Sequence, residues 1–149
     1  HFENDVVYQI DEFFKAVFKT PCVYKLFTLP LKEGRHRTIH FLYAYLKHFE
    51  FREEEIEQIL RMKNGEVITP ISERVKKVME FIKLFAAPLD DFEMTFNTAR
   101  KYYGRNYSLP SCEKIRGYGK FMESLGFGDI GICDSSCPLY KKGVEPCPQ

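Results

Sequence analysis

Apolar residues recur at three- and four-residue steps through the first part of the chain, which is the spacing of an amphipathic helix. We therefore expect a first helix from Asn4 to Phe18, well buried on one side. It should end before Thr20, because Pro21 restricts the residue that precedes it. Cys22 then lies at a helix junction. The apolar positions are Val6, Val7, Ile10, Phe13, Phe14, Val17 and Phe18.

The same reasoning predicts five more helices, whose ends carry helix-start and helix-stop residues. They cover residues 38–49, 53–65, 69–85, 90–104 and 111–125. In the helix over 69–85, Thr69 is placed to cap and Pro70 to occupy the first helical position. Asp90 and Glu93 have the spacing of a capping box, which favours a helix cap over a metal-binding role for Asp90 and Asp91. The buried stripe of the 69–85 helix should be Ile71, Val75, Val78, Met79, Ile82 and Phe85.

Some polar and aromatic positions are assigned by the same pattern. Tyr103 should be buried, because it continues the apolar stripe of the helix over 90–104. That stripe consists of Phe92, Phe96 and Ala99. His48 and Lys63 are interpreted as ordinary surface residues.

The character of the chain changes after Leu125, where Gly, Pro and Ser become frequent and three of the five cysteines occur. Such a segment buries too little apolar surface to order itself, so we expect it either to need a covalent or metal clamp or to be flexible. The pattern contains no sustained alternation typical of strands. The fold class is therefore all-α, a compact helical domain of about six helices with an irregular cysteine-rich C-terminal segment. We expect residues 1–149 to be one domain that belongs to a longer chain.

The amino-acid composition sets further limits on the size of the core and on the classes of partner. The chain has 149 residues, of which 44% are hydrophobic, enough for one core. Lys and Arg total 22 against 21 acidic residues, so nucleic-acid binding requires a local patch rather than a global charge. No segment has the roughly 18 apolar residues of a membrane span, so we expect a soluble protein, cytoplasmic or, in a eukaryote, nuclear. With 14 Phe, 9 Tyr and no Trp, aromatic rings should supply much of the core.

The cysteines leave three chemistries open when their spacing alone is considered. Disulfides suit extracellular chains, and an odd number of cysteines leaves one over. A tetrahedral zinc site usually takes two close pairs, and only Cys133 and Cys137 are close. An iron–sulfur cluster takes four thiolates that can be scattered through a fold. A thiolate at a helix N-terminus is stabilised by the helix dipole, which is the position expected for Cys112.

Two stretches of the chain resemble a known family. The sequence FNTARKYYGRNYSLPSCEKIRGYG (residues 96–119) resembles the C-terminal iron–sulfur domain of the archaeal and eukaryotic DNA primase large subunit. The family shares its Tyr-rich helix, glycine and Ser-Cys segment. The upstream stretch TPCVYKLFTLPLKEGRHRTIHFLYAYLKHF (residues 20–49) is similar to the family's Pro-Cys segment, which is followed by a short basic, histidine-containing stretch and then an aromatic helix. The two stretches occur in the family's order.

The resemblance implies an all-helical domain with one [4Fe-4S] cluster and no polymerase active site of its own. Such a domain binds template and initiating nucleotide or primer, and a catalytic primase subunit supplies the chemistry. By position, Cys22 and Cys112 match two cluster ligands, and Cys137 and Cys147 are preferred for the others, with Cys133 as the alternative. The short tail and the extra cysteine indicate a diverged member, such as an accessory or mobile-element primase component.

Two groups of residues are the predicted contacts to nucleic acid. The resemblance places template and primer phosphates at the basic stretch that opens the helix over 38–49. Cations interleaved with tyrosines around the Ser-Cys segment suit single-stranded template, because rings stack on bases while cations hold the backbone. The candidates are Arg35, His36, Arg37, His40, Arg100, Lys101, Tyr102, Arg105, Tyr107, Lys114 and Arg116.

A different class of protein is also compatible with these residues. It is a helical interaction module, stabilised by zinc or disulfides, whose basic residues meet an acidic protein partner. The sequence has no Walker loop, no dinucleotide fingerprint and no HExxH motif, so no separate catalytic site is predicted.

Overall fold

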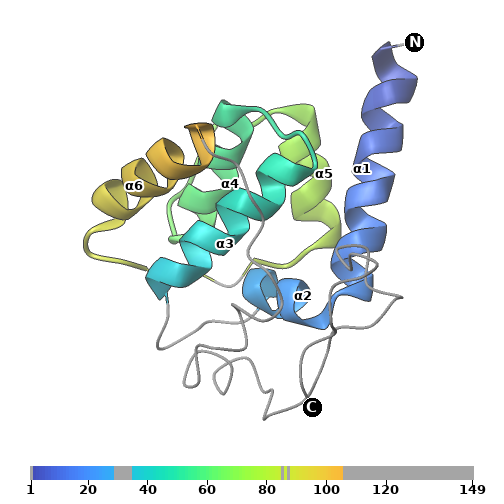
Figure 1. The fold of residues 1–149 in the computed structure, drawn as a ribbon. Coiled ribbons are helices and arrows are strands. Elements are labelled where there is room, and N and C mark those ends of the chain that lie inside the picture. The colour runs from blue at the N-terminus through green and yellow to red at the C-terminus, as the bar shows by residue number, and fades with distance from the viewer. Residues whose placement is uncertain (1, 29–34, 85, 87, 106–149) are drawn as a thin grey trace.

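A computed structural model describes residues 2–28, 35–84, 86 and 88–105, without the side chains of residues 2–9, 21, 22, 104 and 105. This part of the chain is helical, with no strand, and confirms the all-α class. No helix within it is long and apolar enough to cross a membrane. Its helices are α1 (Phe2–Lys19), α2 (Pro21–Thr28), α3 (Arg35–His48), α4 (Glu53–Lys63), α5 (Glu73–Phe81) and α6 (Phe92–Arg105) (Figure 1).

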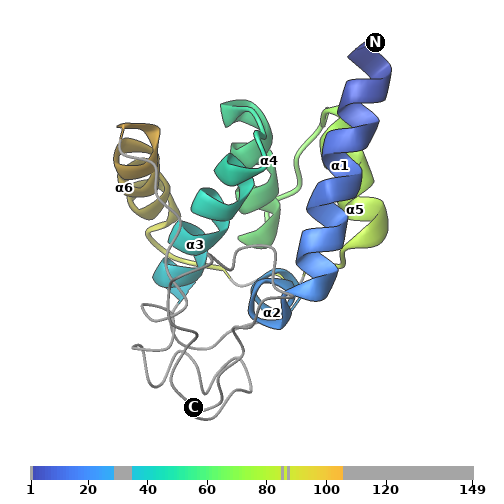
Figure 2. The same cartoon turned by 45° about the vertical axis from the view of Figure 1, so that its right-hand side comes forward.

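The first helix is confirmed, but the junction after it is itself a helix. Pro21 begins α2, and the amide of Tyr24 donates to the Thr20 carbonyl at 3.0 Å. Proline is well accommodated at a first helical position, where its missing N–H has no intrahelical partner in any case. Figures 1 and 2 show α1 lying beside α5, with α2 crossing the lower end of α1. Cys22 thus belongs to the first turn of α2.

The middle helices follow the predicted order with shifted ends. α3 begins at Arg35 rather than Thr38, and α4 ends at Lys63, after which Gly65 adopts a φ of 94°. Such a positive φ favours glycine, so Gly65 acts as the predicted stop.

The start of α5 differs from the prediction. Ser72, and not Thr69, caps the helix, because its Oγ accepts from the Val75 amide at 3.3 Å. Pro70 therefore precedes the cap instead of occupying the first helical position. The helix ends at Phe81, while Val75 and Val78 are buried as expected and Phe85 lies outside the described residues.

The start of α6 also differs. Its first helical bond runs from the Thr95 amide to the Asp91 carbonyl, so the helix begins two residues later than predicted. The Glu93 carboxylate engages Arg61 of α4. Tyr103 is buried on the predicted stripe. The predicted helix over 111–125 lies outside the described residues.

The core is built largely from aromatic rings, as the composition predicts. Phe13 of α1 is fully buried, and its ring lies within 4.9 to 6.2 Å, centroid to centroid, of five other rings. These rings come from α1, α2, α3 and the segment that leads into α4, so one side chain joins several elements. The five rings are Phe14, Phe27, Tyr45, Phe49 and Phe51.

Lys63 corrects the sequence analysis. It was predicted to be an ordinary surface residue, but only 1% of it is exposed, and its Nζ donates to the Phe27 carbonyl at 3.0 Å. The bond connects the end of α4 to the end of α2. Burial, which disfavours the charged form, lowers the pKa of Lys63 to about 8. His48 is exposed, as predicted.

Candidate nucleic-acid interface

The packing of α3 on α6 places the described members of the two predicted groups of nucleic-acid residues on or next to two contacting helices. Tyr43 of α3 is fully buried, and its ring lies 5.9 Å from Phe96 and 6.0 Å from Tyr103, the latter nearly parallel. Its hydroxyl donates to Glu53 at 2.6 Å. Burial and the Glu53 carboxylate both raise the pKa of Tyr43, so this phenol stays protonated and bonds α3 to α4, while its ring packs against α6.

Two of the predicted phosphate contacts have partners within the protein. Arg35 donates from Nη1 to the Pro88 carbonyl at 2.7 Å. His36 is bonded through Nδ1 to Thr95 Oγ1 at 2.7 Å, and its Nε2 lies 3.6 Å from Asp91 Oδ1. Both side chains therefore tie the start of α3 to the segment that opens α6. Any contact they make with nucleic acid has to coexist with this structural role.

A run of aromatic side chains continues from α3 to the surface of α6. The His40 ring lies 6.2 Å from the buried Tyr103 ring, which in turn lies 4.8 Å from Tyr102. Tyr102 is 51% exposed. Arg37, also exposed, precedes His40 by three residues, a spacing that puts both on one side of a helix. Two packed helices thus carry four predicted contacts: Arg37 and His40 on α3, and Lys101 and Tyr102 on α6.

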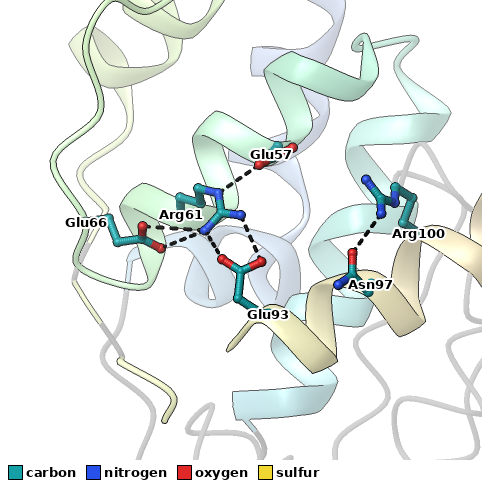
Figure 3. Close-up of polar contacts among 6 residues, drawn as sticks. All are labelled: Glu57, Arg61, Glu66, Glu93, Asn97 and Arg100. Atoms are coloured by element: carbon teal, nitrogen blue, oxygen red, sulfur yellow. Dashed lines mark hydrogen bonds and ion pairs between the residues drawn. The ribbon is translucent and has the colours of Figure 1, made fainter. Parts of the chain in front are cut away.

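Arg100 and Lys101 are both exposed on α6. Arg100 donates from Nη2 to Asn97 at 2.8 Å, as Figure 3 shows, and its guanidinium lies 5.6 Å from the Phe96 ring centroid. Arg100 is thereby oriented by its own helix. The side chain of Arg105 and the whole of Tyr107, Lys114 and Arg116 lie outside the described residues.

The sequence analysis missed the cluster that holds α6 to α4. Arg61 donates to Glu93 at 2.6 and 3.1 Å and to Glu57 at 2.9 Å, and its Nη1 lies 3.3 Å from Glu66 (Figure 3). Its guanidinium also lies 5.2 Å from the Phe92 ring centroid. The hydrogen bonds to Glu93 and Glu57 raise the pKa of Arg61 still further above its already high value, against the opposing effect of burial. The spacing of Glu57 and Arg61, four residues apart on one helix, was the signal available in the sequence.

The predicted cluster ligands fall outside the described side chains. Cys22 is placed only through its backbone in the first turn of α2, and Cys112, Cys133, Cys137 and Cys147 follow the last described residue. Among the described side chains, no group of three or more His, Cys, Asp or Glu could hold a metal ion. The predicted ligand set is not tested by the described side chains and stays a prediction.

Comparison with known proteins adds no further assignment. No protein-family model, curated protein or solved structure gives a significant match to this chain. The resemblance to the primase large subunit therefore stays a prediction from the sequence motifs described above.

Proposed function

We propose that this chain is a non-catalytic iron–sulfur domain that supports primer initiation by binding single-stranded template and the initiating nucleotide or primer, in the manner of the primase large subunit. The observation that carries the proposal is the packing of α3 on α6. It brings the basic, histidine-containing helix of one primase-like stretch against the tyrosine-rich helix of the other. In a sequence with a net charge of +1, such convergence is what creates a local binding surface.

The exposed residues of this surface have the chemistry that single strands require. Arg37 and Lys101 supply cations for phosphates, and each neutralised phosphate releases counterions. Tyr102 supplies a half-exposed ring on which a base can stack. The buried Tyr103 stands behind it at an interplanar angle of 83° and supports its position. A base stacked on Tyr102 would then lie beside the cations that hold its backbone.

The cluster has a structural task in this proposal. Cys22, Cys112, Cys137 and Cys147 would hold it, with Cys133 as the alternative ligand. When bound, a [4Fe-4S] cluster cross-links four thiolates distant in sequence and thereby substitutes for apolar core. The polymerase chemistry belongs to a catalytic primase subunit or domain, which is the expected protein partner.

Binding is tested with the full chain and a fluorescein-labelled oligothymidylate, using fluorescence anisotropy at fixed salt. We expect Tyr102→Ala to weaken binding by about tenfold, since stacking on one base contributes roughly 1–3 kcal/mol. Tyr102→Phe should retain most of the affinity because its ring can still stack. Lys101→Ala and Arg37→Ala should each weaken binding several-fold.

The matched control is Lys77→Ala, which removes the same charge from α5, a helix that contacts α1 and α4. Equal affinity of wild type, Lys101→Ala and Tyr102→Ala would refute the proposed surface. Arg35→Ala is a poor first choice, because loss of the bond to Pro88 would also disturb the fold.

The cofactor is tested separately on anaerobically purified protein. A brown protein with iron and acid-labile sulfide supports the cluster, whereas a colourless protein with one zinc supports the alternative interaction module. Single Cys→Ser variants then assign the ligands. Cys133→Ser should leave the iron content unchanged, while the same change at Cys22, Cys112, Cys137 or Cys147 should lower it.

A further inference from the structure

The two long edges of α6 differ in charge and in the helices that they meet. An α-helix turns by about 100° per residue, so residues seven apart lie nearly on one line and residues nine apart lie on opposite sides. Glu93 and Arg100 therefore share one edge, while Thr95 and Tyr102 share the opposite edge. We call the first the α4 edge, because Glu93 bonds Arg61 of α4 (Figure 3), and the second the Tyr102 edge.

Carboxylates outnumber cations among the described residues of the α4 edge. Three of them surround the guanidinium of Arg61, at N–O distances of 2.6 to 3.3 Å. A fourth, Glu53, pairs with Lys47 at 3.5 Å and accepts from the Tyr43 hydroxyl. The carboxylates are Glu53, Glu57, Glu66 and Glu93, and the cations are Lys47, Arg61 and Arg100. A row of phosphates on this edge would thus meet net negative charge, which repels it.

Arg100 belongs to this charged network. Its Nη2 donates to Asn97 at 2.8 Å, and its guanidinium lies 5.6 Å from the Phe96 ring centroid. The hydrogen bond from Arg61 lowers the pKa of the Glu93 carboxyl, and the positive charge of Arg100 lowers it further. The charge of Arg100 therefore already stabilises a carboxylate of the fold.

The Tyr102 edge leads to the basic start of α3 instead. Thr95 Oγ1 lies 2.7 Å from His36 Nδ1, and the seven residues from Thr95 to Tyr102 rise by about 10 Å along the helix. Arg35, in the same first turn of α3, donates to the Pro88 carbonyl at 2.7 Å. Because that carbonyl is neutral, the bond does not cancel the positive charge of Arg35.

Two carboxylates lie near the Tyr102 edge, and both are at the start of α6. Asp91 Oδ1 lies 3.6 Å from His36 Nε2, and Asp90 precedes it in the chain. Eleven residues, or about 16 Å of helix rise, separate Asp91 from Tyr102. This is about twice the Debye length of ~8 Å at physiological salt. The end of the edge that carries Tyr102 and the exposed Lys101 is thus screened from both carboxylates.

We infer that bound single-stranded nucleic acid follows the Tyr102 edge of α6 towards the start of α3, and that Arg100 serves the fold on the α4 edge without contacting a phosphate. The inference rests on the proposed function and adds which side of α6 the strand takes. A base stacks on Tyr102, and Lys101 and Arg35 meet phosphates. The carboxylates of the α4 edge keep the strand from crossing α6.

The test compares Arg100→Gln with Lys101→Gln in the full chain, by the anisotropy of fluorescein-labelled oligothymidylate over a series of salt concentrations. Both variants lose one positive charge at adjacent exposed positions of α6, so each is the matched control of the other. Lys101→Gln should weaken binding several-fold and reduce the slope of log affinity against log salt by about 0.7, the effect of one phosphate contact on a single strand. Arg100→Gln should keep the wild-type slope.

A third variant places a carboxylate on the path of the strand. Thr98 is exposed one turn before Tyr102, on the same side of α6. Thr98→Glu should therefore weaken binding several-fold, while circular dichroism shows the helix content of the wild type.

Two outcomes overturn the inference: a slope for Arg100→Gln that falls by about 0.7, or wild-type affinity of Thr98→Glu. A lower affinity of Arg100→Gln at the wild-type slope supports it, because a looser α6 weakens binding without removing a phosphate contact. Failure of the proposed function is distinguishable. The wild type would then bind no oligothymidylate, or Tyr102→Ala and Lys101→Gln would both bind like wild type, and the inference would fall with it.

Discussion

The two ends of α4 each bury a charged side chain, and the surroundings of those side chains differ. Glu55 in the first turn is fully buried, and Lys63 in the last turn is 1% exposed. Glu55 lies among hydrogen-bond donors and cations. Lys63 donates to a main-chain carbonyl, and burial lowers its pKa to about 8. Equal burial thus has different electrostatic consequences, which depend on the groups that meet the charge.

The environment of Glu55 is contributed by two helices. Its Oε1 accepts from the Arg52 amide at 2.8 Å, which caps α4, while Oε2 accepts from Ser72 Oγ at 3.2 Å and lies 3.6 Å from Arg74 Nε. Ser72 in turn caps α5. One carboxylate therefore joins the starts of α4 and α5, and it also opposes the effect of burial, which lowers the pKa of Arg74.

Removal of the Glu55 carboxylate should have the largest effect. Glu55→Ala deprives the Arg52 amide and the Ser72 hydroxyl of their acceptor. It also removes the carboxylate that lies beside the Arg74 guanidinium. We expect a loss of about 3–5 kcal/mol in the free energy of unfolding, the usual cost of breaking a buried ion pair. Urea unfolding followed by circular dichroism measures it. Glu55→Gln keeps an acceptor oxygen and should lose less; a loss equal to that of Glu55→Ala would show that the negative charge alone accounts for the effect.

Lys63 should make stability rise with pH. The unfolded chain holds this proton up to about pH 10.5, whereas the folded chain releases it near pH 8, so the unfolded state binds more protons between these values. Between about pH 7.5 and 9.5 the free energy of unfolding should increase by about 2 kcal/mol from this residue. Below pH 8 both states are protonated and the effect levels off.

The matched variant is Lys63→Met, in which this increase should be absent. The difference between the two proteins isolates Lys63 from other groups that titrate in the same range. Measurements should stop below pH 10, because the fold raises the pKa of Tyr43. Above that pH the unfolded chain loses the Tyr43 phenol proton while the folded chain keeps it, which lowers the free energy of unfolding. Identical slopes for wild type and Lys63→Met would contradict the assignment.

Arg61 should give the smallest of these effects. It lies between the two ends of α4 and is only partly buried, and Glu93, one of its partners, is exposed. We expect Arg61→Ala to lower the free energy of unfolding by about 1 kcal/mol through lost ion pairs and ring contacts. Arg61→Lys should lose part of this, because it keeps the charge but not the bidentate fork. Lys15→Ala, which breaks an exposed pair with Glu12, is the control and should cause no measurable change.

The contrast between Glu55 and Lys63 also shows what the sequence could predict. The apolar residues Ile56, Ile59 and Leu60 form the buried stripe of α4, and Lys63 continues it at a three-residue step. The pattern therefore contained the burial of Lys63, but residue type argued for solvent. The contact with Phe27 depends on how α4 meets α2, and periodicity within one helix carries no information about that.

The existence of α1, α3, α4, α5 and α6 was predictable, whereas α2, the helix ends and the tertiary contacts were not. Thr69 and Ser72 are both good N-cap residues, and the choice between them was decided by the acceptor that Glu55 offers to Ser72. At the candidate interface, the exposure of Tyr102 and the burial of Tyr103 followed from the helical repeat. The bonds of Arg35 and His36 to the start of α6 could not be predicted, because they join positions more than 50 residues apart.

The cluster around Arg61 affects how nucleic-acid binding has to be measured. Its ion pairs help to hold α6, and salt screens partly exposed pairs just as it screens phosphate contacts. A salt titration of binding would therefore report two processes, counterion release from the strand and loosening of the helix that carries Tyr102. The slope of binding affinity against salt concentration, taken alone, would therefore overestimate the number of phosphate contacts. The difference in slope between wild type and Lys101→Ala cancels the internal contribution, since both proteins retain Arg61.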